Sequence, residues 1–293
     1  MKTIAQFVTL ILLLVAPCIQ ASPSPDLLDT ICDAKLQKGL EQSLEQLNLS
    51  KAAAQEDLTI ALVDITDPFE PRHAYINPNK MMYAASLPKI AILLGAFDRI
   101  SHNEMKLDKY TEQALTRMIR NSCNKSATTM LNRVGKKYLA DLLQSPRYKL
   151  YDPSRNGGLW VGKEYAKAKA WKRDPLNNLS HGATALQVAR FYFMLETGQL
   201  VSPEYSRQMK SMLGDPAIHH KFVKGLQAVY PESLIFRKSG TWKSFHSDSA
   251  IIEHNHRSYI AVAMANNVMG GQWLSDLIVT MDKLIFDNAP SLN

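Results

Sequence analysis

The spacing of apolar and polar residues predicts strands near both ends of the chain. Five stretches have the alternation or the short apolar run of a strand: residues 58–65, 72–76, 234–242, 249–253 and 258–265. Polar residues 253–257 are typical of a hairpin turn between the last two. Helical spacing in residues 27–47 and 272–286 adds a helix before the first strand and another that closes the chain.

The middle of the chain is predicted to be mainly helical. Three stretches carry helical patterns: residues 110–120, 125–143 and 183–196. Residues 85–100 (ASLPKIAILLGAFDRI) have apolar residues on every side, which indicates a buried helix. Residues 152–181 show little periodicity, and a loop that long inside a compact domain is usually functional.

This order of elements predicts an α+β fold. Strands from both ends of the chain, about residues 26–84 and 212–293, can form one antiparallel sheet covered by helices as an α/β/α sandwich. Residues of about 85–211 then form an inserted, all-helical lobe. We expect a cleft between the sheet lobe and the helical lobe.

The first 21 residues predict an export signal. Residues 4–16 are an almost unbroken apolar stretch that follows Lys2 and precedes Pro17, and the small residue Ala21 suits cleavage. The stretch is too short to span a bilayer, which needs about 20 apolar residues, and no later stretch is long enough. We expect secretion across the inner membrane into the periplasm, with residues 22–293 as the mature domain. Lipidation of Cys18 is an alternative that the preceding Pro17 disfavours.

Composition narrows the function classes. The 293 residues are 46% hydrophobic and 21% charged, which excludes disordered and collagen-like chains and indicates one large domain or two small ones. Lys and Arg number 34 against 27 Asp and Glu, and the resulting charge of +7 is spread along the chain. This excess is too small to predict a nucleic-acid partner.

Ser86-Leu87-Pro88-Lys89 opens the predicted buried helix. Pro88 suits a first helical turn, because its missing N–H would be unpaired there anyway. Residues three apart share a helix face, so the Lys89 amine is expected to reach the Ser86 hydroxyl. A serine becomes a good nucleophile when a neighbour takes its proton, and a desolvated lysine can do so. The pattern therefore predicts Ser86 as a nucleophile with Lys89 as its base.

A second motif, Ser122-Cys123-Asn124, lies between two predicted helices. It offers a hydroxyl for proton relay and an amide that can hold a substrate.

A third motif, Lys238-Ser239-Gly240, lies on a predicted strand. A cation there can bind a substrate carboxylate, and Gly240 lets another part of the chain approach the backbone closely. The backbone N–H of Thr241 can form an oxyanion hole together with that of Ser86.

The order S-x-x-K, S-x-N and K-[ST]-G resembles that of active-site serine β-lactamases and penicillin-binding proteins, and the length resembles the class A group. Each motif alone is weak, but the three occur in order on the expected elements. The resemblance implies that Ser86 is the nucleophile and that Lys89 and Ser122 carry protons. It also implies that the substrate is bound by Asn124, Lys238 and Ser239.

The resemblance is weakest at the deacylation step. Class A enzymes activate water with the glutamate of an E-x-x-L-N loop, and that string does not occur here. Glu164 in GLWVGKEY keeps the side chain without its context, whereas Asp174 in RDPLNN keeps the Leu-Asn ending with a shorter carboxylate. We predict Glu164 as the deacylating residue and Asp174 as the alternative, although both also fit surface carboxylates among lysines.

The carboxylate site also departs from the class A pattern. Those enzymes commonly carry an arginine on the strand after K-[ST]-G, where this chain has Ser249. We expect the site to rest on Lys238, Ser239 and Arg237 instead. Cys123 replaces the aspartate of the second motif, whose role is structural.

Two other arrangements remain open in the sequence. Four residues close in sequence have side chains that can bind a metal: His246, Asp248, His254 and His256. A polar hairpin tip explains His254 and His256 equally well. Cys32 and Cys123 can pair only if they lie within bridging distance, and we favour two separate thiols.

The sequence thus predicts an exported serine hydrolase with three possible activities. A class A-like β-lactamase opens the lactam ring and breaks down the antibiotic, which confers resistance. A peptidoglycan D-Ala-D-Ala peptidase forms the same acyl-enzyme but treats β-lactams as slow inhibitors, and a weakly catalytic homologue only binds them. We expect a small-molecule β-lactam or peptide substrate, a monomer, and no cofactor or metal.

Overall fold

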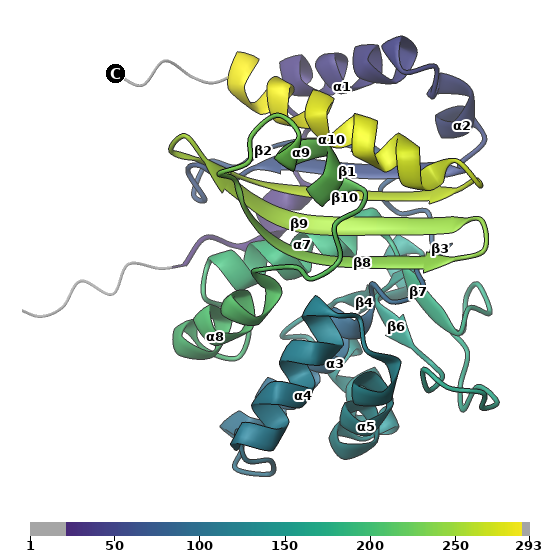
Figure 1. The fold of residues 1–293 in the computed structure, drawn as a ribbon, viewed down its shortest axis with the longest axis vertical. Coiled ribbons are helices and arrows are strands. Elements are labelled where there is room, and N and C mark those ends of the chain that lie inside the picture. Colours follow the sequence, from purple (N-terminus) through teal and green to yellow (C-terminus); the bar gives the residue numbers. More distant parts are fainter. Residues whose placement is uncertain (1–21, 289–293) are drawn as a thin grey trace, which may run out of the picture.

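The computed structural model describes residues 22–288, so the predicted signal peptide with Cys18 lies outside the described residues. A five-stranded sheet in the order β2-β1-β10-β9-β8 crosses the centre of the molecule (Figure 1). All four pairings are antiparallel. The strands are β1 (Leu58–Asp64), β2 (Arg72–Ile76), β8 (Leu234–Trp242), β9 (Phe245–His254) and β10 (Arg257–Asn266). Both ends of the chain therefore contribute strands, and the predicted fold class is confirmed.

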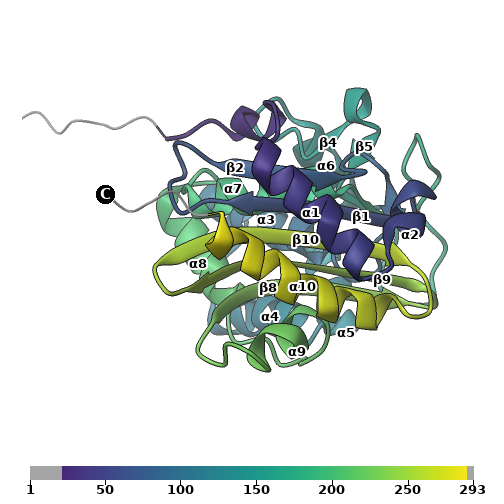
Figure 2. The ribbon, with the colours of Figure 1, turned by 90° about the horizontal axis from the view of Figure 1, so that it is seen from above.

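Two helices lie across one face of the sheet, α1 (Ala34–Gln46) and α10 (Gly270–Asp287), as the view from above shows (Figure 2). The short α2 (Ser50–Ala54) follows α1, and α9 (Phe222–Gln227) packs beside α10. Alternate residues of β1 point to opposite faces. Leu58, Ile60 and Leu62 belong to the core under α1 and α10, and Ala61 and Val63 belong to the core on the other face. Both faces are buried, which explains the unbroken apolar run in this strand.

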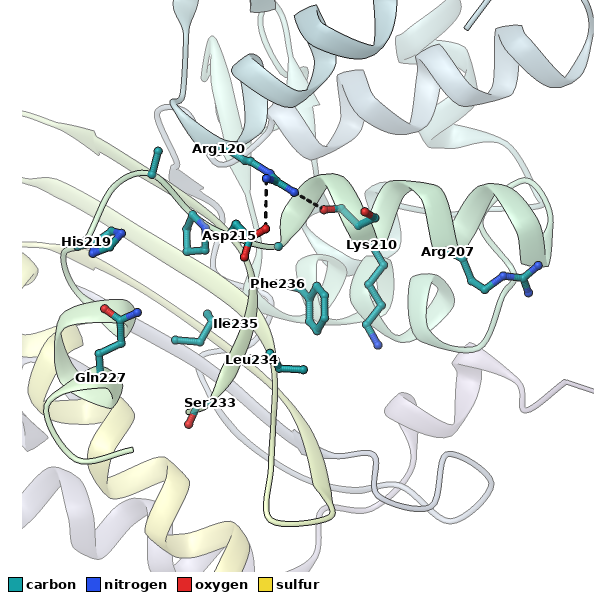
Figure 3. A pocket seen from close by; sticks show the side chains of 14 residues that line it. Arg120, Arg207, Lys210, Asp215, His219, Gln227, Ser233, Leu234, Ile235 and Phe236 are labelled. Atoms are coloured by element: carbon teal, nitrogen blue, oxygen red, sulfur yellow. Dashed lines mark hydrogen bonds and ion pairs between the residues drawn. The ribbon is translucent and has the colours of Figure 1, made fainter. Parts of the chain in front are cut away.

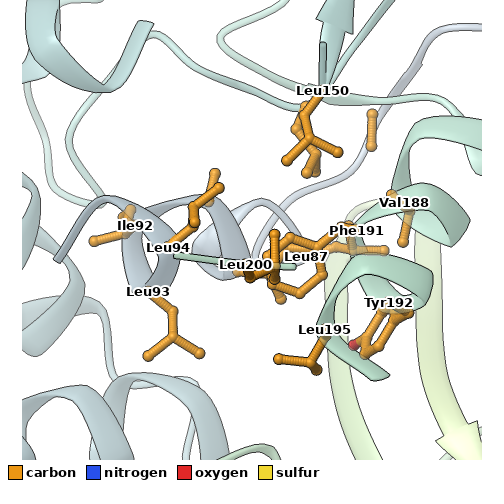
Figure 4. Close-up of a cluster of buried hydrophobic side chains, with 14 of the residues drawn as sticks. Leu87, Ile92, Leu93, Leu94, Leu150, Val188, Phe191, Tyr192, Leu195 and Leu200 are labelled. Carbon is orange, nitrogen blue, oxygen red and sulfur yellow. The ribbon is translucent and has the colours of Figure 1, made fainter. Parts of the chain in front are cut away.

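On the other face, α7 (Ala185–Glu196) packs against β1 and β10, and α8 (Pro203–Leu213) packs against β8. Both helices lie in the range expected for the helical lobe but cover the sheet. Phe191 of α7 and Leu87, in the turn before α3, belong to the same buried core, part of which Figure 4 shows.

The helical lobe contains α3 (Lys89–Ser101), α4 (Lys109–Arg120), α5 (Asn124–Val134) and α6 (Lys136–Gln144). As predicted, α3 is buried on nearly every side. The single helix expected over residues 125–143 is two helices, because Gly135 between them has a φ of 90°. The first helix expected over residues 27–47 is likewise split into η1 (Pro25–Asp29) and α1.

Residues 152–181 form small elements rather than a bare loop. β3 (Met82–Tyr83), β7 (His181–Ala183) and β6 (Trp160–Val161) pair as one small sheet, and β4 (Tyr151–Asp152) pairs with β5 (Gly157–Gly158) around η2 (Pro153–Arg155). Among residues 22–288, no helix combines the length and the apolar character needed to cross a membrane.

Candidate active site

Ser86 lies in a tight turn that leads into α3. The backbone N–H of Leu87 donates to Ala84 O and that of Lys89 donates to Ser86 O, both across three residues, so the α-helix proper begins at Lys89. The expected helix start at Ser86 is therefore three residues early. Ala85, directly before the predicted nucleophile Ser86, has a φ of 51°. Non-glycine residues in this region are strained, and such strain gathers at functional sites.

Lys89 is fully buried, and its contacts define the centre of the site. Its Nζ donates to Ser122 O at 2.6 Å and Asn124 Oδ1 at 2.8 Å, and lies 3.3 Å from Ser122 Oγ. These hydrogen bonds go to the second motif, whereas we expected the amine to reach Ser86. Burial lowers the pKa of Lys89 to about 7, so a large share of this amine is uncharged at neutral pH.

Ser122 connects the two lysines of the site. Its Oγ lies 2.9 Å from Lys238 Nζ as well as 3.3 Å from Lys89 Nζ. The backbone of Ser122 has a φ of 53°, so it does not continue the helical conformation of α4. A hydroxyl that contacts two amines can accept a proton from one and donate its own to the other, so the geometry suits the expected proton relay.

Strand β8 brings the third motif beside the turn that contains Ser86. Lys238 is 2% exposed, and burial together with the neighbouring Lys89 cation lowers its pKa well below the usual range. A Cβ added to Gly240 would lie 2.7 Å from Ser86 N and closer still to Ala84 O. Only glycine fits this approach, as its sequence position indicated. Ser239 is buried, and Thr241 next to it is exposed.

Arg237 is not placed to bind a substrate carboxylate. Its guanidinium is buried and donates to both oxygens of Asp248, at 2.8 Å from Nε to Oδ1 and 2.8 Å from the second terminal nitrogen to Oδ2. Successive strand residues point to opposite sheet faces, so Arg237 and Lys238 diverge. The expectation for Arg237 is wrong for this reason. Ser249, where class A enzymes commonly have arginine, donates to Lys238 O at 2.9 Å and supports the strand.

Neither candidate for the deacylating carboxylate contacts Lys89. Glu164 accepts a hydrogen bond from Lys136 on α6, which lowers the pKa of its carboxyl group and makes it a weak base. Asp174 is 2% exposed and accepts from Tyr151 Oη and from the backbone N–H of Asn177 at 2.7 Å, so it stabilises its own loop.

An aromatic residue faces Lys89 instead. The ring of Tyr165, next to Glu164 in sequence, lies 4.6 Å from Lys89 Nζ. Its hydroxyl lies 3.3 Å from Ala85 O, to which it donates, and the ring packs against His181 with centroids 4.3 Å apart. Sequence reasoning missed Tyr165 because the segment has no periodicity to place its side chains.

Two of the four residues considered as metal ligands, Asp248 and His254, have other partners. Asp248 holds Arg237, and His254 Nε2 lies 2.6 Å from Asp282 Oδ1. No metal-ligating group of three or more His, Cys, Asp or Glu is found in residues 22–288. Cys32 and Cys123 are separate free thiols.

A cavity of about 680 Å³ lies beside the first residues of β8, and Ser86 is not among the residues that line it (Figure 3). Arg120 and Lys210 contribute cations to its wall. Arg120 pairs with Asp215, and Lys210 is held by Glu196 and Glu253. Arg120 and Lys210 therefore already have counter-ions.

The fold and the motif order define a protein of the serine β-lactamase and penicillin-binding type. A family model described as the β-lactamase enzyme family matches residues 39–112 and 108–288, so the chain belongs to that family. No curated protein matches it.

Solved structures share the fold at low identity. PBP-A is 14% identical, with 87% of this chain and 97% of PBP-A covered and a TM-score of 0.65. The extended-spectrum β-lactamase TLA-1 is 14% identical, with coverage of 86% and 98% and a TM-score of 0.66. A β-lactamase from Chitinophaga pinensis is 14% identical, with coverage of 85% and 100% and a TM-score of 0.64.

Proposed function

We propose that this protein is a serine hydrolase that forms an acyl-enzyme on Ser86 with β-lactams or D-Ala-D-Ala peptides. The observation that carries the proposal is the buried Lys89 amine, with its pKa of about 7, three residues after the serine. An uncharged amine can take the serine proton as the carbonyl is attacked. Ser122 Oγ, in contact with both lysines, then passes a proton to the leaving nitrogen.

The backbone at Ser86 and Thr241 supplies the stabilisation of the developing negative charge. Gly240 brings β8 against the Ser86 N–H, so the N–H groups of Ser86 and Thr241 can both face the attacked carbonyl oxygen. Lys238 and Ser239 lie beside this position and suit the carboxylate that β-lactams and D-Ala-D-Ala peptides share. Asn124, exposed at the start of α5, suits the substrate amide.

We further propose that the acyl-enzyme formed with a β-lactam is long-lived. A class A β-lactamase needs a carboxylate that activates water beside the acylated serine. Here Glu164 pairs with Lys136, Asp174 is held in its own loop, and the Tyr165 ring lies against Lys89. This arrangement favours the D-Ala-D-Ala peptidase alternative over a rapid β-lactamase. A PBP-A mutant has been solved as an acyl-enzyme complex with penicillin G, the kind of species we expect.

Intact-protein mass spectrometry after brief exposure to benzylpenicillin tests both statements. We expect one adduct of the mass of the whole drug, its loss in Ser86→Ala, and its persistence long after free drug is removed. Rapid drug hydrolysis without a lasting adduct would restore the β-lactamase interpretation. Neither adduct nor turnover would overturn the acyl-enzyme proposal itself.

Glu164→Gln separates a structural carboxylate from a catalytic one. If Glu164 only pairs with Lys136, the variant should lose the adduct at the wild-type rate. A much slower loss than in the wild type would identify Glu164 as the deacylating base after all. Release of D-alanine from a D-Ala-D-Ala peptide, measured in the same variants, tests the peptidase activity directly.

Export into the periplasm is part of the proposal, because residues 4–16 and Ala21 form a signal-peptide pattern. Cell fractionation, with the N-terminus of the mature chain sequenced, tests this. A mature protein that begins at Ser22 supports cleavage after Ala21, and a lipid-modified Cys18 would contradict it.

A further inference from the structure

A buried lysine with no role assigned so far lies behind the strand that carries Gly240 and Thr241. Lys221 directly precedes α9 and is 3% exposed. Its Nζ donates to Gly240 O at 2.6 Å, Thr241 Oγ1 at 2.9 Å and Ser247 O at 3.1 Å. An ammonium group has three N–H donors, and here each has an acceptor. Two of these acceptors are carbonyl oxygens, which cannot donate in return.

The backbone of Lys221 is held in an uncommon conformation. Its φ is 54° and its ψ is −118°, a region that residues with a side chain rarely occupy. The next residue, Phe222, donates its N–H to Asp248 Oδ2 at 3.2 Å, and this contact ties the strained turn to β9. Strain of this kind persists only where the surroundings enforce it, and it is concentrated at functional sites.

The hydrogen bond from Lys221 to Gly240 O contacts the peptide unit that also carries the Thr241 N–H. The carbonyl of Gly240 and the N–H of Thr241 belong to one planar peptide unit and point in opposite directions. Gly240 pairs with Ser247 on β9, and Lys221 bridges the carbonyl oxygens of both. The Gly240 carbonyl faces β9, so the Thr241 N–H points away from β9, off the open edge of the sheet that β8 forms. The Ser86 N–H lies close to Gly240 on the neighbouring sheet face.

We propose that Lys221 is a positioning residue that holds the Gly240–Thr241 peptide unit with its N–H aimed at the oxyanion formed after attack by Ser86. This inference rests on the proposed function of Ser86. A charge-assisted hydrogen bond fixes the plane of the peptide unit and polarises the N–H at its other end. Donors that are oriented in advance stabilise the transition state without reorganisation during the reaction.

A direct contact with the substrate carboxylate is the competing role. A cavity of about 320 Å³ beside Thr241 is lined in part by Lys221. However, all three N–H groups of Lys221 already have acceptors in the protein, and little of its side chain is exposed. A ligand that has an oxyanion but no carboxylate distinguishes the two roles.

Phenylboronic acid is such a ligand. It forms a tetrahedral adduct with a serine oxygen, and one of its own oxygens then occupies the oxyanion position. For Lys221→Met we expect about tenfold weaker phenylboronate binding and about tenfold slower acylation by benzylpenicillin, with an unchanged dissociation constant for penicillin before acylation. Lys224→Met is the matched control, since Lys224 is an exposed lysine of α9 whose Nζ contacts Gln272. It should behave as the wild type.

The opposite result would overturn the inference: a folded Lys221→Met protein with unchanged phenylboronate affinity, or one in which only the penicillin dissociation constant rises. If Lys221→Met does not fold, Lys221→Gln replaces it, because glutamine keeps two N–H donors without the charge. Unchanged phenylboronate affinity in Lys221→Gln would likewise overturn the inference. Wild-type protein that neither binds phenylboronate nor is acylated would overturn the proposed function, and this inference with it.

Discussion

The rate at which a β-lactam acylates Ser86 is expected to rise with pH and to level off above neutrality. Burial lowers the pKa of Lys89 from 10.5 to about 7, and only the uncharged amine can accept the serine proton. The uncharged fraction of such an amine is about 10% at a pH of about 6 and about 90% at a pH of about 8, so acylation should become about ninefold faster between them. A lysine with an ordinary pKa would give a rate that keeps rising about tenfold per pH unit to about pH 10.

Single-turnover labelling with a fluorescent penicillin measures this profile. Protein is mixed with excess reagent at each pH and denatured at timed intervals, and Ser86→Ala reports non-specific labelling. Samples held at each pH and returned to neutrality show whether the protein stays folded. A rate that is independent of pH, or one that still climbs tenfold per unit above about pH 9, would refute the role of Lys89 as the base.

The cause of the low pKa can be tested in the same assay. The ring of Tyr165 covers Lys89, so Tyr165→Ala should admit water, raise the pKa of Lys89 and move the midpoint of the profile to higher pH. Tyr165→Phe keeps the ring and loses only the hydroxyl that contacts Ala85 O, so its midpoint should stay in place. Identical midpoints in Tyr165→Ala and the wild type would contradict burial as the cause.

Three further predictions concern packing and pairing around the site. Gly240→Ala forces a Cβ against Ala84 O, so penicillin labelling should slow about 100-fold, and wild-type labelling in the folded variant would contradict the close approach. Asp248→Ala leaves the Arg237 cation buried without its partner and should lower the free energy of unfolding by about 3–5 kcal/mol in urea titrations. Adding Arg237→Met should recover part of that loss, and strictly additive losses would argue against the pair. Cys123→Asp gives α5 a better N-cap, so the free energy of unfolding should rise by about 0.5–1 kcal/mol, and an unchanged or lower Tm would argue against a capping role.

Much of the fold follows from local pattern. The bounds of β8 agree with the predicted residues 234–242, and β1 was located by its unbroken apolar run. The start of β9 at Phe245 was missed, because residues 245–248 are mostly polar. The split of the helix at Gly135 was missed, since a glycine inside a helical pattern is compatible with continuation as well as with a break.

The motif residues of the site could be predicted, but their partners could not. Ser86, Lys89 and Lys238 are marked by short spacings along the chain. Tyr165 and Lys221 act through contacts with backbone carbonyls and with Lys89, and such contacts leave no spacing pattern. Glu164 is the opposite case, because the sequence suggested a catalytic role for it. Its carboxylate instead pairs with Lys136, and only the three-dimensional structure shows this contact.

The strand order also sets when the site can exist during synthesis. The turn that contains Ser86 leaves the ribosome early, as does Lys89, but β8, the strand that lies beside them, is made late. It joins the sheet only through β9, which pairs with β10, and β10 in turn pairs with the early β1. Contacts between such distant parts of a chain form late, because a long loop must close first. A nascent or truncated chain that ends before β8 therefore carries its serine without Lys238 or Gly240. If Ser86 is the nucleophile that we propose, we expect penicillin to label it only after the C-terminal strands have been made.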